Sequence, residues 1–218
     1  TYIDTIAGVR RWCFNALVDS IAVTFNAPAE GEHRYTLQGL QMVRDEPGLI
    51  YHALGVNGAA TKSFLRSENF IEQGAYVAPD LVIFGLGIND AYKPDSDWHP
   101  EEYKARYDTL VDWFRTINPD CAFIFMTNND SYYKRRTPNK HALDVVRVME
   151  ELSKEHDAAL WDLFGVMGGL NSIVLWEEQR LAKSDKIHVT RAGYRLNSDL
   201  LFWAFWEAYE QHLKALAP

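Results

Sequence analysis

The chain has 218 residues, a formal net charge of −8, a pI near 5.3 and 47% hydrophobic residues. This length suits one well-buried domain, and an excess of acids without a long basic run argues against nucleic acid or an anionic membrane as the main partner. A neutral substrate is therefore expected, and no apolar run approaches the roughly 20 residues that cross a bilayer.

Residues 1–48 are expected to be rich in β-structure. Ile21, Val23 and Phe25 alternate with small or polar residues as a half-exposed strand does, and the pattern resumes at Tyr35 and Leu37 after a turn-like segment at residues 26–31. We expect residues 1–48 to be the tail of a small β unit that is inserted into, or precedes, an α/β domain at residues 49–218.

Beyond residue 48, segments typical of strands alternate with segments typical of helices. Apolar runs of strand length lie at residues 49–54, 81–84, 121–126 and 158–161. Helices are predicted at residues 61–73, 100–117 and 139–156, and after Thr190, which is a good N-cap. This alternation predicts a three-layer α/β/α fold with a doubly wound parallel sheet.

Burial can be predicted for three of these segments. The run Leu81–Phe84 suits a strand that is buried on both faces. Helical spacing predicts an inward stripe in two helices, made of Tyr103, Tyr107, Leu110, Val111 and Phe114 in one and of Leu143, Val146 and Leu152 in the other. The aromatic residues of the last helix, Phe202, Trp203, Phe205 and Trp206, are expected to be core, with a role of part of them in an interface as the alternative.

Polar residues follow the strand at residues 81–84. Gly85 and Gly87 let the backbone turn where side chains would crowd it, and they bring Asn89 and Asp90 to the carboxyl end of the strand. Ligands bind at that edge of open α/β sheets. We therefore expect Asn89 to face a site.

A second candidate group is the sequence DKIH, in which Asp185 precedes His188 by three residues, just before the last helix. A carboxylate at this spacing can accept a hydrogen bond from one imidazole nitrogen and leave the other free as a general base. Taken alone, the spacing is also that of a surface or capping histidine. The remaining histidines and both cysteines lack metal-ligand spacing, so no metal site is predicted.

Two neighbouring segments have open interpretations. Residues 128–133 follow a strand, so they either line a substrate pocket or form an ordinary polar loop. Residues 134–136, Lys-Arg-Arg, are expected to be a solvated turn, with a role toward an acidic ligand as the alternative.

Three blocks in this order, GVNGAAT with Gly58, GIND with Asn89, and DKIH, resemble those of the SGNH hydrolase family, the GDSL-like esterases and lipases. The resemblance covers about residues 48–209 and implies a flavodoxin-like fold. It also implies that the Gly58 N–H and the Asn89 amide form an oxyanion hole, with His188 as general base and Asp185 as its orienting partner in a Ser-His-Asp triad. Residues 161–169, WDLFGVMGG, look like a segment of members that deacylate cell-surface polysaccharides.

The chain departs from the family pattern at the nucleophile, because it contains no Gly-Asp-Ser sequence. The nearest sequence is Val18-Asp19-Ser20, where Val18 takes the position of the small residue and no helix is predicted to follow. We therefore expect the nucleophilic serine to lie upstream of Thr1, together with the first strand of the sheet. Without that strand, an interior position of the sheet would be left with unpaired backbone groups. A separate upstream piece is expected to fill this position, and residues of the N-terminal region are the alternative.

The resemblance predicts a serine esterase that removes acetyl or another small acyl group from a carbohydrate, through an acyl-enzyme and without metal or organic cofactor. The alternative is a non-catalytic carbohydrate-binding protein with the same fold. Family members with a β-rich insert are often exported, so a periplasmic or secreted location is expected.

Overall fold

The computed structural model describes residues 2–4, 8–26, 31, 36–37, 39–44 and 46–216. Backbone contacts divide the chain into two units, Thr1–Gly55 and Val56–Pro218. The candidate site residues Gly58, Asn89, Asp185 and His188 all belong to the second unit.

The first unit contains an antiparallel pair of strands, β1 (Tyr2–Asp4) and β2 (Val9–Arg11). The strands predicted at residues 21–25 and 49–54 are wrong: both segments are described, lack strand structure and are exposed. A strand needs a neighbouring strand to pair with, and no described strand of this unit pairs with either segment. The predicted turn falls largely on residues 27–30, which lie outside the described residues, as does Tyr35.

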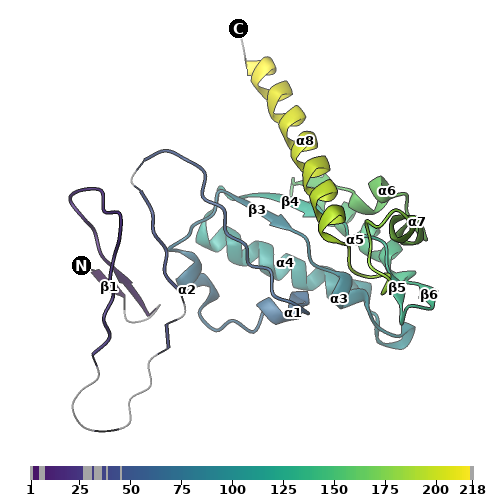
Figure 1. Ribbon diagram of the computed structural model, residues 1–218, viewed down its shortest axis with the longest axis horizontal. Helices are drawn as coiled ribbons and strands as arrows, with labels where there is room; N and C mark the ends of the chain where they lie inside the picture. The colour runs from purple at the N-terminus through teal and green to yellow at the C-terminus, as the bar shows by residue number, and fades with distance from the viewer. Residues whose placement is uncertain are drawn as a thin grey trace. The chain divides into compact units, whose positions relative to one another are not determined.

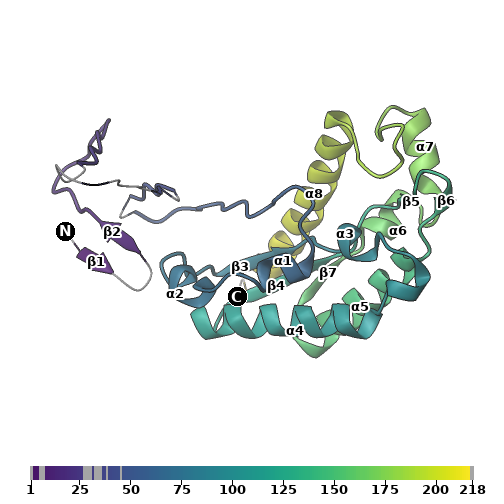
Figure 2. The same ribbon diagram turned by 90° about the horizontal axis from the view of Figure 1, so that it is seen from below.

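The second unit is organised around a parallel sheet of β3 (Leu81–Phe84), β4 (Ala122–Met126) and β7 (Ala159–Trp161), in that spatial order (Figure 2). Phe84 is paired with Phe125, and Phe125 with Leu160. Three predicted strands are thereby confirmed within a residue of their expected bounds. The carboxyl ends of all three strands meet at one edge of the sheet, because the strands are parallel.

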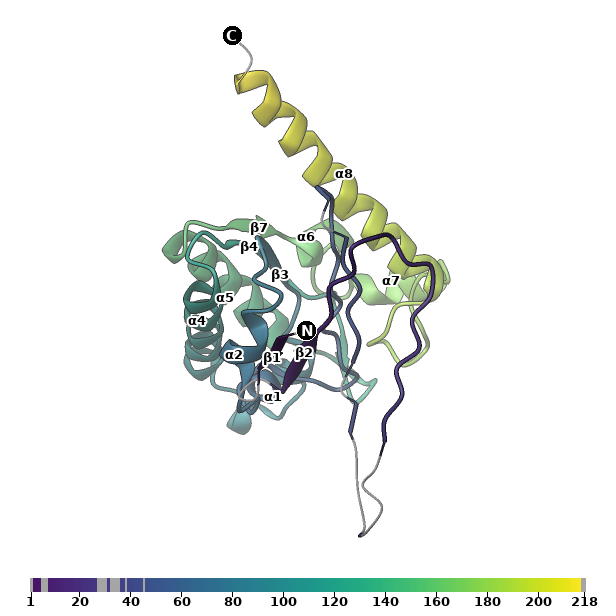
Figure 3. The same cartoon turned by 90° about the vertical axis from the view of Figure 1, so that its left-hand side faces the viewer.

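Two long helices, α4 (Pro100–Ile117) and α5 (His141–Glu155), cover one face of the sheet (Figure 3). All five residues of the inward stripe predicted for α4 are buried. The α5 prediction is wrong for Leu143, which is exposed. Leu152 is buried as predicted, Val146 is half-buried, and the helix also buries Val145, Val148 and Met149.

Shorter helices α6 (Leu163–Met167) and α7 (Ser172–Glu178) lie on the other side and pack around Ile173 against Met126 and Trp161. This cover does not extend to β3, where Leu81 is 38% and Ile83 is 44% exposed. The prediction that β3 is buried on both faces is therefore wrong. In the described sheet β3 is an edge strand, and only its Phe84 face is packed.

Short elements fill the loops around the sheet. The helix predicted at residues 61–73 is split into α1 (Thr61–Phe64) and α2 (Phe70–Gly74). The remaining short elements are α3 (Ile88–Ala91), the 3₁₀ helix η1 (Asp95–Asp97) and the hairpin of β5 (Tyr132–Tyr133) and β6 (Thr137–Pro138).

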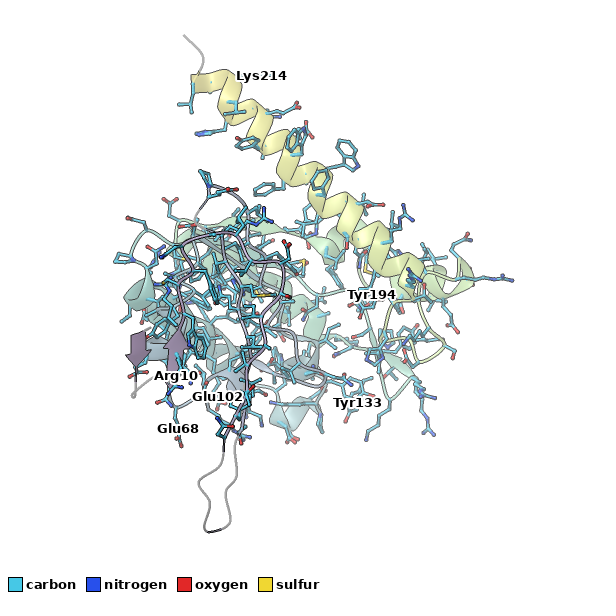
Figure 4. All side chains as sticks on the ribbon, turned by 60° about the vertical axis from the view of Figure 1, so that its left-hand side comes forward. Arg10, Glu68, Glu102, Tyr133, Tyr194 and Lys214 are labelled. Atoms are coloured by element: carbon cyan, nitrogen blue, oxygen red, sulfur yellow. The ribbon has the colours of Figure 1, made fainter. Side chains whose placement is uncertain are left out.

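The last helix, α8 (Arg191–Leu216), begins after Thr190, whose hydroxyl accepts a hydrogen bond from the Gly193 N–H at 3.2 Å (Figure 1). Its residues Leu200, Leu201 and Ala204 are half-buried. The aromatic residues predicted to be core are instead exposed, up to 64% for Trp203. Tyr194 and Lys214 mark the two ends of this helix in Figure 4. No helix in the described residues has both the length and the apolarity needed to span a membrane.

Candidate active site

The turn after β3 is fixed by a glycine that admits no side chain. Gly87 has φ +142°, and a Cβ atom placed there would lie 2.3 Å from the Tyr103 hydroxyl and 2.4 Å from Nδ2 of Asn128. A methyl group cannot occupy that space without moving both neighbours. The chain enters α3 directly after this close approach, and α3 carries Asn89.

Two buried tyrosines of α4 hold the same turn. The hydroxyls of Tyr103 and Tyr107 both donate to the Leu86 carbonyl at 2.8 Å, and the Tyr107 hydroxyl accepts from the Leu86 N–H at 3.2 Å. Burial raises the pKa of both tyrosines well above the ordinary value, so both remain neutral donors. The end of β3 is thus fixed by the core of the unit.

Asn89 and Gly58, predicted to act together, lie beside one another in the structure. The Asn89 amide donates one N–H to the Ala59 carbonyl at 2.8 Å, which orients the side chain against the turn that contains Gly58. Gly58 has φ +75°, and in the described residues its N–H makes no hydrogen bond. The second Asn89 N–H and the Gly58 N–H are therefore both available as donors.

The residue after Asn89 anchors the two segments to each other. Asp90 is buried and accepts hydrogen bonds from the Thr61 N–H at 2.9 Å and from the Thr61 hydroxyl at 2.7 Å. Because Thr61 opens α1, this carboxylate satisfies a free N–H at the helix N-terminus. The sequence analysis gave neither residue this role, although both stand inside the GVNGAAT and GIND blocks.

Asp185 and His188 form the pair that their spacing predicted. Oδ2 of Asp185 lies 2.9 Å from Nδ1 of His188, while Oδ1 accepts from the N–H groups of Ile187 and His188, also at 2.9 Å. Desolvation would raise the pKa of Asp185, but these three hydrogen bonds together lower it to about 2. The carboxylate is therefore charged near neutral pH and holds the imidazole through Nδ1.

The other imidazole nitrogen, Nε2, makes no hydrogen bond within the described part of the chain. The His188 side chain is 54% exposed, so Nε2 is accessible. The backbone beneath it is fixed, because the His188 carbonyl accepts from the Lys183 N–H at 2.8 Å and Val189 bridges to Ala182. An imidazole so placed can act as a general base.

The loop after β4 connects the two halves of the site. Asn128 lies beside Gly87, as the near contact above shows, and Nδ2 of Asn129 donates to the Ile187 carbonyl at 3.0 Å. The Tyr132 N–H also donates to the Lys186 carbonyl at 2.8 Å. Residues 128–133 therefore join the turn that precedes Asn89 to the loop that carries His188, which puts both at the carboxyl edge of the sheet.

Asp130, within this loop, is a buried carboxylate that the sequence analysis missed. Its Oδ2 accepts from the Ile173 N–H at 3.0 Å, whereas its Oδ1 is buried and has no partner in the described residues. Desolvation raises its pKa above the ordinary value. An aspartate in a polar loop gives no sequence signal of burial, so only the structure shows this role in holding α7.

Ser20, the weak candidate for the nucleophile, belongs to the first unit. It is exposed, and residues 20–26 form neither a strand nor a helix, so the strand-to-helix turn expected of such a nucleophile is absent there. Among the described residues no serine hydroxyl bonds to His188, and no three His, Cys, Asp or Glu side chains gather as metal ligands do.

Known proteins resemble this chain in sequence and in fold. Residues 19–196 match the model of the GDSL-like Lipase/Acylhydrolase family. A peptidoglycan O-acetylesterase shares the fold with a TM-score of 0.67 and 21% identity over 73% of this chain, which spans only 46% of that esterase.

Two further solved structures share the fold. A lipase/acylhydrolase from Enterococcus faecalis has a TM-score of 0.51 and 20% identity, with 66% of this chain and 69% of that chain covered. An acetyl xylan esterase has a TM-score of 0.54 and 15% identity, with 69% and 78% covered. A search of curated proteins finds no match. Since the family model covers most of the chain, the protein belongs to the GDSL-like Lipase/Acylhydrolase family.

Proposed function

We propose that this chain supplies the oxyanion hole and the His-Asp pair of a serine esterase that removes acetyl or another small acyl group from a carbohydrate. The proposal depends on the His188–Asp185 pair, in which Nε2 of His188 is free. The loop at residues 128–133 connects this pair to the turn that precedes Asn89. An ester carbonyl over the Gly58 and Asn89 donors would lie at the edge of the sheet that also bears the base.

The chemistry follows from the charges that develop during acyl transfer. His188 takes the proton of a serine hydroxyl as its oxygen attacks the ester carbonyl, and the new oxyanion receives hydrogen bonds from Gly58 and Asn89. The same imidazole then returns the proton to the departing sugar oxygen. Water repeats the sequence on the acyl-enzyme and releases the acid. Asp185 stabilises the imidazolium in each step.

We further propose that the nucleophilic serine lies upstream of Thr1, and that residues 1–48 are the tail of a β-rich insert that follows it. The absence of Gly-Asp-Ser from the sequence and the exposed edge strand β3, with Leu81 and Ile83 uncovered, support this assignment. A row of unpaired strand groups beside apolar side chains favours pairing with another strand. Labelling with a fluorophosphonate followed by peptide mapping tests it, and a labelled Ser20 would contradict it.

The carbohydrate substrate is inferred from the relatives. The peptidoglycan O-acetylesterase and the acetyl xylan esterase are named for acetyl esters on polysaccharides, and both share this fold. A protein that acts on cell-surface polysaccharide must reach it, so we propose a periplasmic or secreted location. Cell fractionation followed by immunodetection checks this, and a purely cytoplasmic signal would count against it.

Hydrolysis of 4-nitrophenyl acetate and of acetylated xylan by the full-length protein tests the proposed roles. We expect His188→Ala to lower kcat by about 10³-fold or more, and Asn89→Ala by about 10²- to 10³-fold, because each removes a group that acts in the transition state. His212→Ala, on exposed α8, is the matched control and should leave kcat unchanged. Activity that survives His188→Ala would refute the assignment. Sugar binding without serine labelling would favour a non-catalytic carbohydrate-binding protein.

A further inference from the structure

The hairpin of β5 and β6 lies between the two halves of the candidate site. On one side the Tyr132 N–H donates to the carbonyl of Lys186, two residues before His188. On the other side the Lys134 N–H donates to the Tyr92 hydroxyl at 2.9 Å, and Asn139 Nδ2 donates to the Ala91 carbonyl at 3.2 Å. Ala91 and Tyr92 lie two and three residues after Asn89. A chain-like substrate with an ester at Asn89 and His188 would therefore pass over or beside this hairpin.

The hairpin concentrates positive charge on an acidic protein. Residues 131–143 contain four cations, Lys134, Arg135, Arg136 and Lys140, and no acidic residue, whereas the whole chain has a net charge of −8. All four are exposed, and none has a carboxylate within 4.0 Å in the described residues. By contrast, Lys104, Arg106 and Arg147 on α4 and α5 all pair with carboxylates. The hairpin cations are thus free to bind an external anion.

The backbone of the hairpin turn is unusual for such residues. Lys134 has φ +49° and Arg135 has φ +62°, in the left-handed region that glycine and asparagine favour. Two consecutive side chains in this region cost stability that a glycine or asparagine turn would avoid. The turn therefore presents long cationic side chains where the fold alone would favour other residues.

Half-exposed tyrosines accompany the cations. The rings of Tyr92 and Tyr133 lie 5.0 Å apart at 56°, and Lys134 Nζ lies 5.1 Å from the centre of the Tyr133 ring. Figure 4 labels Tyr133, whose aromatic ring is half-exposed. Flat apolar faces beside unpaired cations suit a ligand that combines sugar rings with acidic groups, because rings pack on aromatic faces while guanidinium groups bind carboxylates.

We infer that the β5–β6 hairpin, with Tyr92, is a subsite for a carboxylate-bearing glycan, whose ester it directs toward Asn89 and His188. The inference rests on the proposed esterase function and narrows its substrate class. It also replaces the neutral substrate expected from net charge, because a local cationic surface attracts an anion even when the protein as a whole is acidic. The alternative considered for residues 134–136, a role toward an acidic ligand, is the one that the structure favours.

Binding of sodium polygalacturonate to the full-length protein at low salt, measured by titration calorimetry, tests the subsite. The double variant Arg135→Gln/Arg136→Gln should weaken binding by about three- to tenfold, since each exposed ion pair contributes modestly. The control variant Lys154→Gln/Lys214→Gln removes the same amount of charge at two places away from the hairpin. Lys154 lies about 20 Å along α5 from the end of that helix that adjoins the hairpin, and Lys214 lies near the end of α8. It should bind like the parent protein.

Neutral xylan and single-stranded DNA are the comparison ligands. The subsite is supported when polygalacturonate binds more tightly than both and loses affinity with salt and with the hairpin variant alone. Equal loss in the control variant, equal binding of neutral xylan, or tighter binding of DNA would overturn it. Hydrolysis of 4-nitrophenyl acetate, which has no glycan, should be unchanged in the hairpin variant. If the parent protein binds the glycan but does not hydrolyse 4-nitrophenyl acetate, the esterase function is refuted and the subsite is supported. If it hydrolyses the ester but does not bind the glycan, the subsite is refuted and the esterase function is supported.

Discussion

Replacing Asp185 by Asn tests both the stability and the chemistry of the candidate site. The amide oxygen of Asn can still accept from the Ile187 and His188 N–H groups, which lie 2.9 Å from Oδ1. The amide nitrogen would then face Nδ1 of His188 and donate to it, whereas the carboxylate accepts from it. The imidazole would carry its proton on Nε2 and lose its capacity as a base. Packing stays nearly the same, and only charge and proton position change.

The expected loss of stability can be worked out from the pKa of Asp185. The difference between the ordinary value of 3.8 and the value of about 2 in the folded protein corresponds to about 2 kcal/mol at neutral pH. The side chain is 22% exposed, so solvent screening reduces the difference and we expect about 1–2 kcal/mol. Because the folded pKa is depressed, this contribution is full above pH 4 and disappears as the pH falls through about 2.

Urea denaturation of the parent protein and Asp185→Asn from pH 7 to pH 2 measures the first effect. The two free energies of unfolding should differ most at neutral pH and converge toward pH 2. Hydrolysis of 4-nitrophenyl acetate measures the second effect, and kcat should fall by about 10³- to 10⁴-fold, as when a triad carboxylate is made neutral. Asp97→Asn, in exposed η1, is the control. A difference in stability that persists unchanged at pH 2, or a loss of kcat below about tenfold, would refute the reasoning.

Three further substitutions test the support of the site. Gly87→Ala should lower the free energy of unfolding by about 2 kcal/mol or more and reduce kcat, because the added Cβ would lie 2.3 Å from the Tyr103 hydroxyl. Urea denaturation measures the first effect and ester hydrolysis the second, and a variant that behaves like the parent protein would contradict the close approach. Thr61→Val should lower the free energy of unfolding by about 1–3 kcal/mol, because the buried Asp90 loses a hydroxyl donor. Thermal unfolding against the half-buried Thr109→Val is the comparison, and equal losses would argue against the anchor. Asp130→Asn should have a higher free energy of unfolding than the parent protein at pH 7, because desolvation raises the pKa of the carboxyl and opposes its charge in the folded state. This difference should shrink toward pH 4, where the carboxyl becomes protonated. Urea denaturation measures both, and a loss of stability at pH 7 would be the contrary result.

The elements that could be placed correctly from the sequence are those with a local signal of their own. The α4 stripe from Tyr103 to Phe114 is buried throughout because its apolar residues recur at helical spacing. The strands β3, β4 and β7 form at the expected apolar runs because the composition and length of these runs favour strands. The His188–Asp185 pair was predictable for the same reason, since both residues lie in one short loop. By contrast, Asp130 and Thr61 become buried through partners 43 and 29 residues away, and local sequence contains no record of such contacts.

The incorrect predictions for residues 49–54 and for β3 share one physical cause, which is that burial depends on a neighbour as well as on a pattern. Residues 49–54 and β3 have the composition of interior strands, yet residues 49–54 form no strand and β3 is left open on one face in the described residues. The same composition would be satisfied if both segments paired with a strand between them, and the exposed Ile83 would then gain cover from its surroundings. The exposed apolar residues at these positions therefore support the proposal that the complete sheet has more than its three described strands. A disagreement between hydrophobic pattern and observed burial is what an absent neighbouring strand would produce.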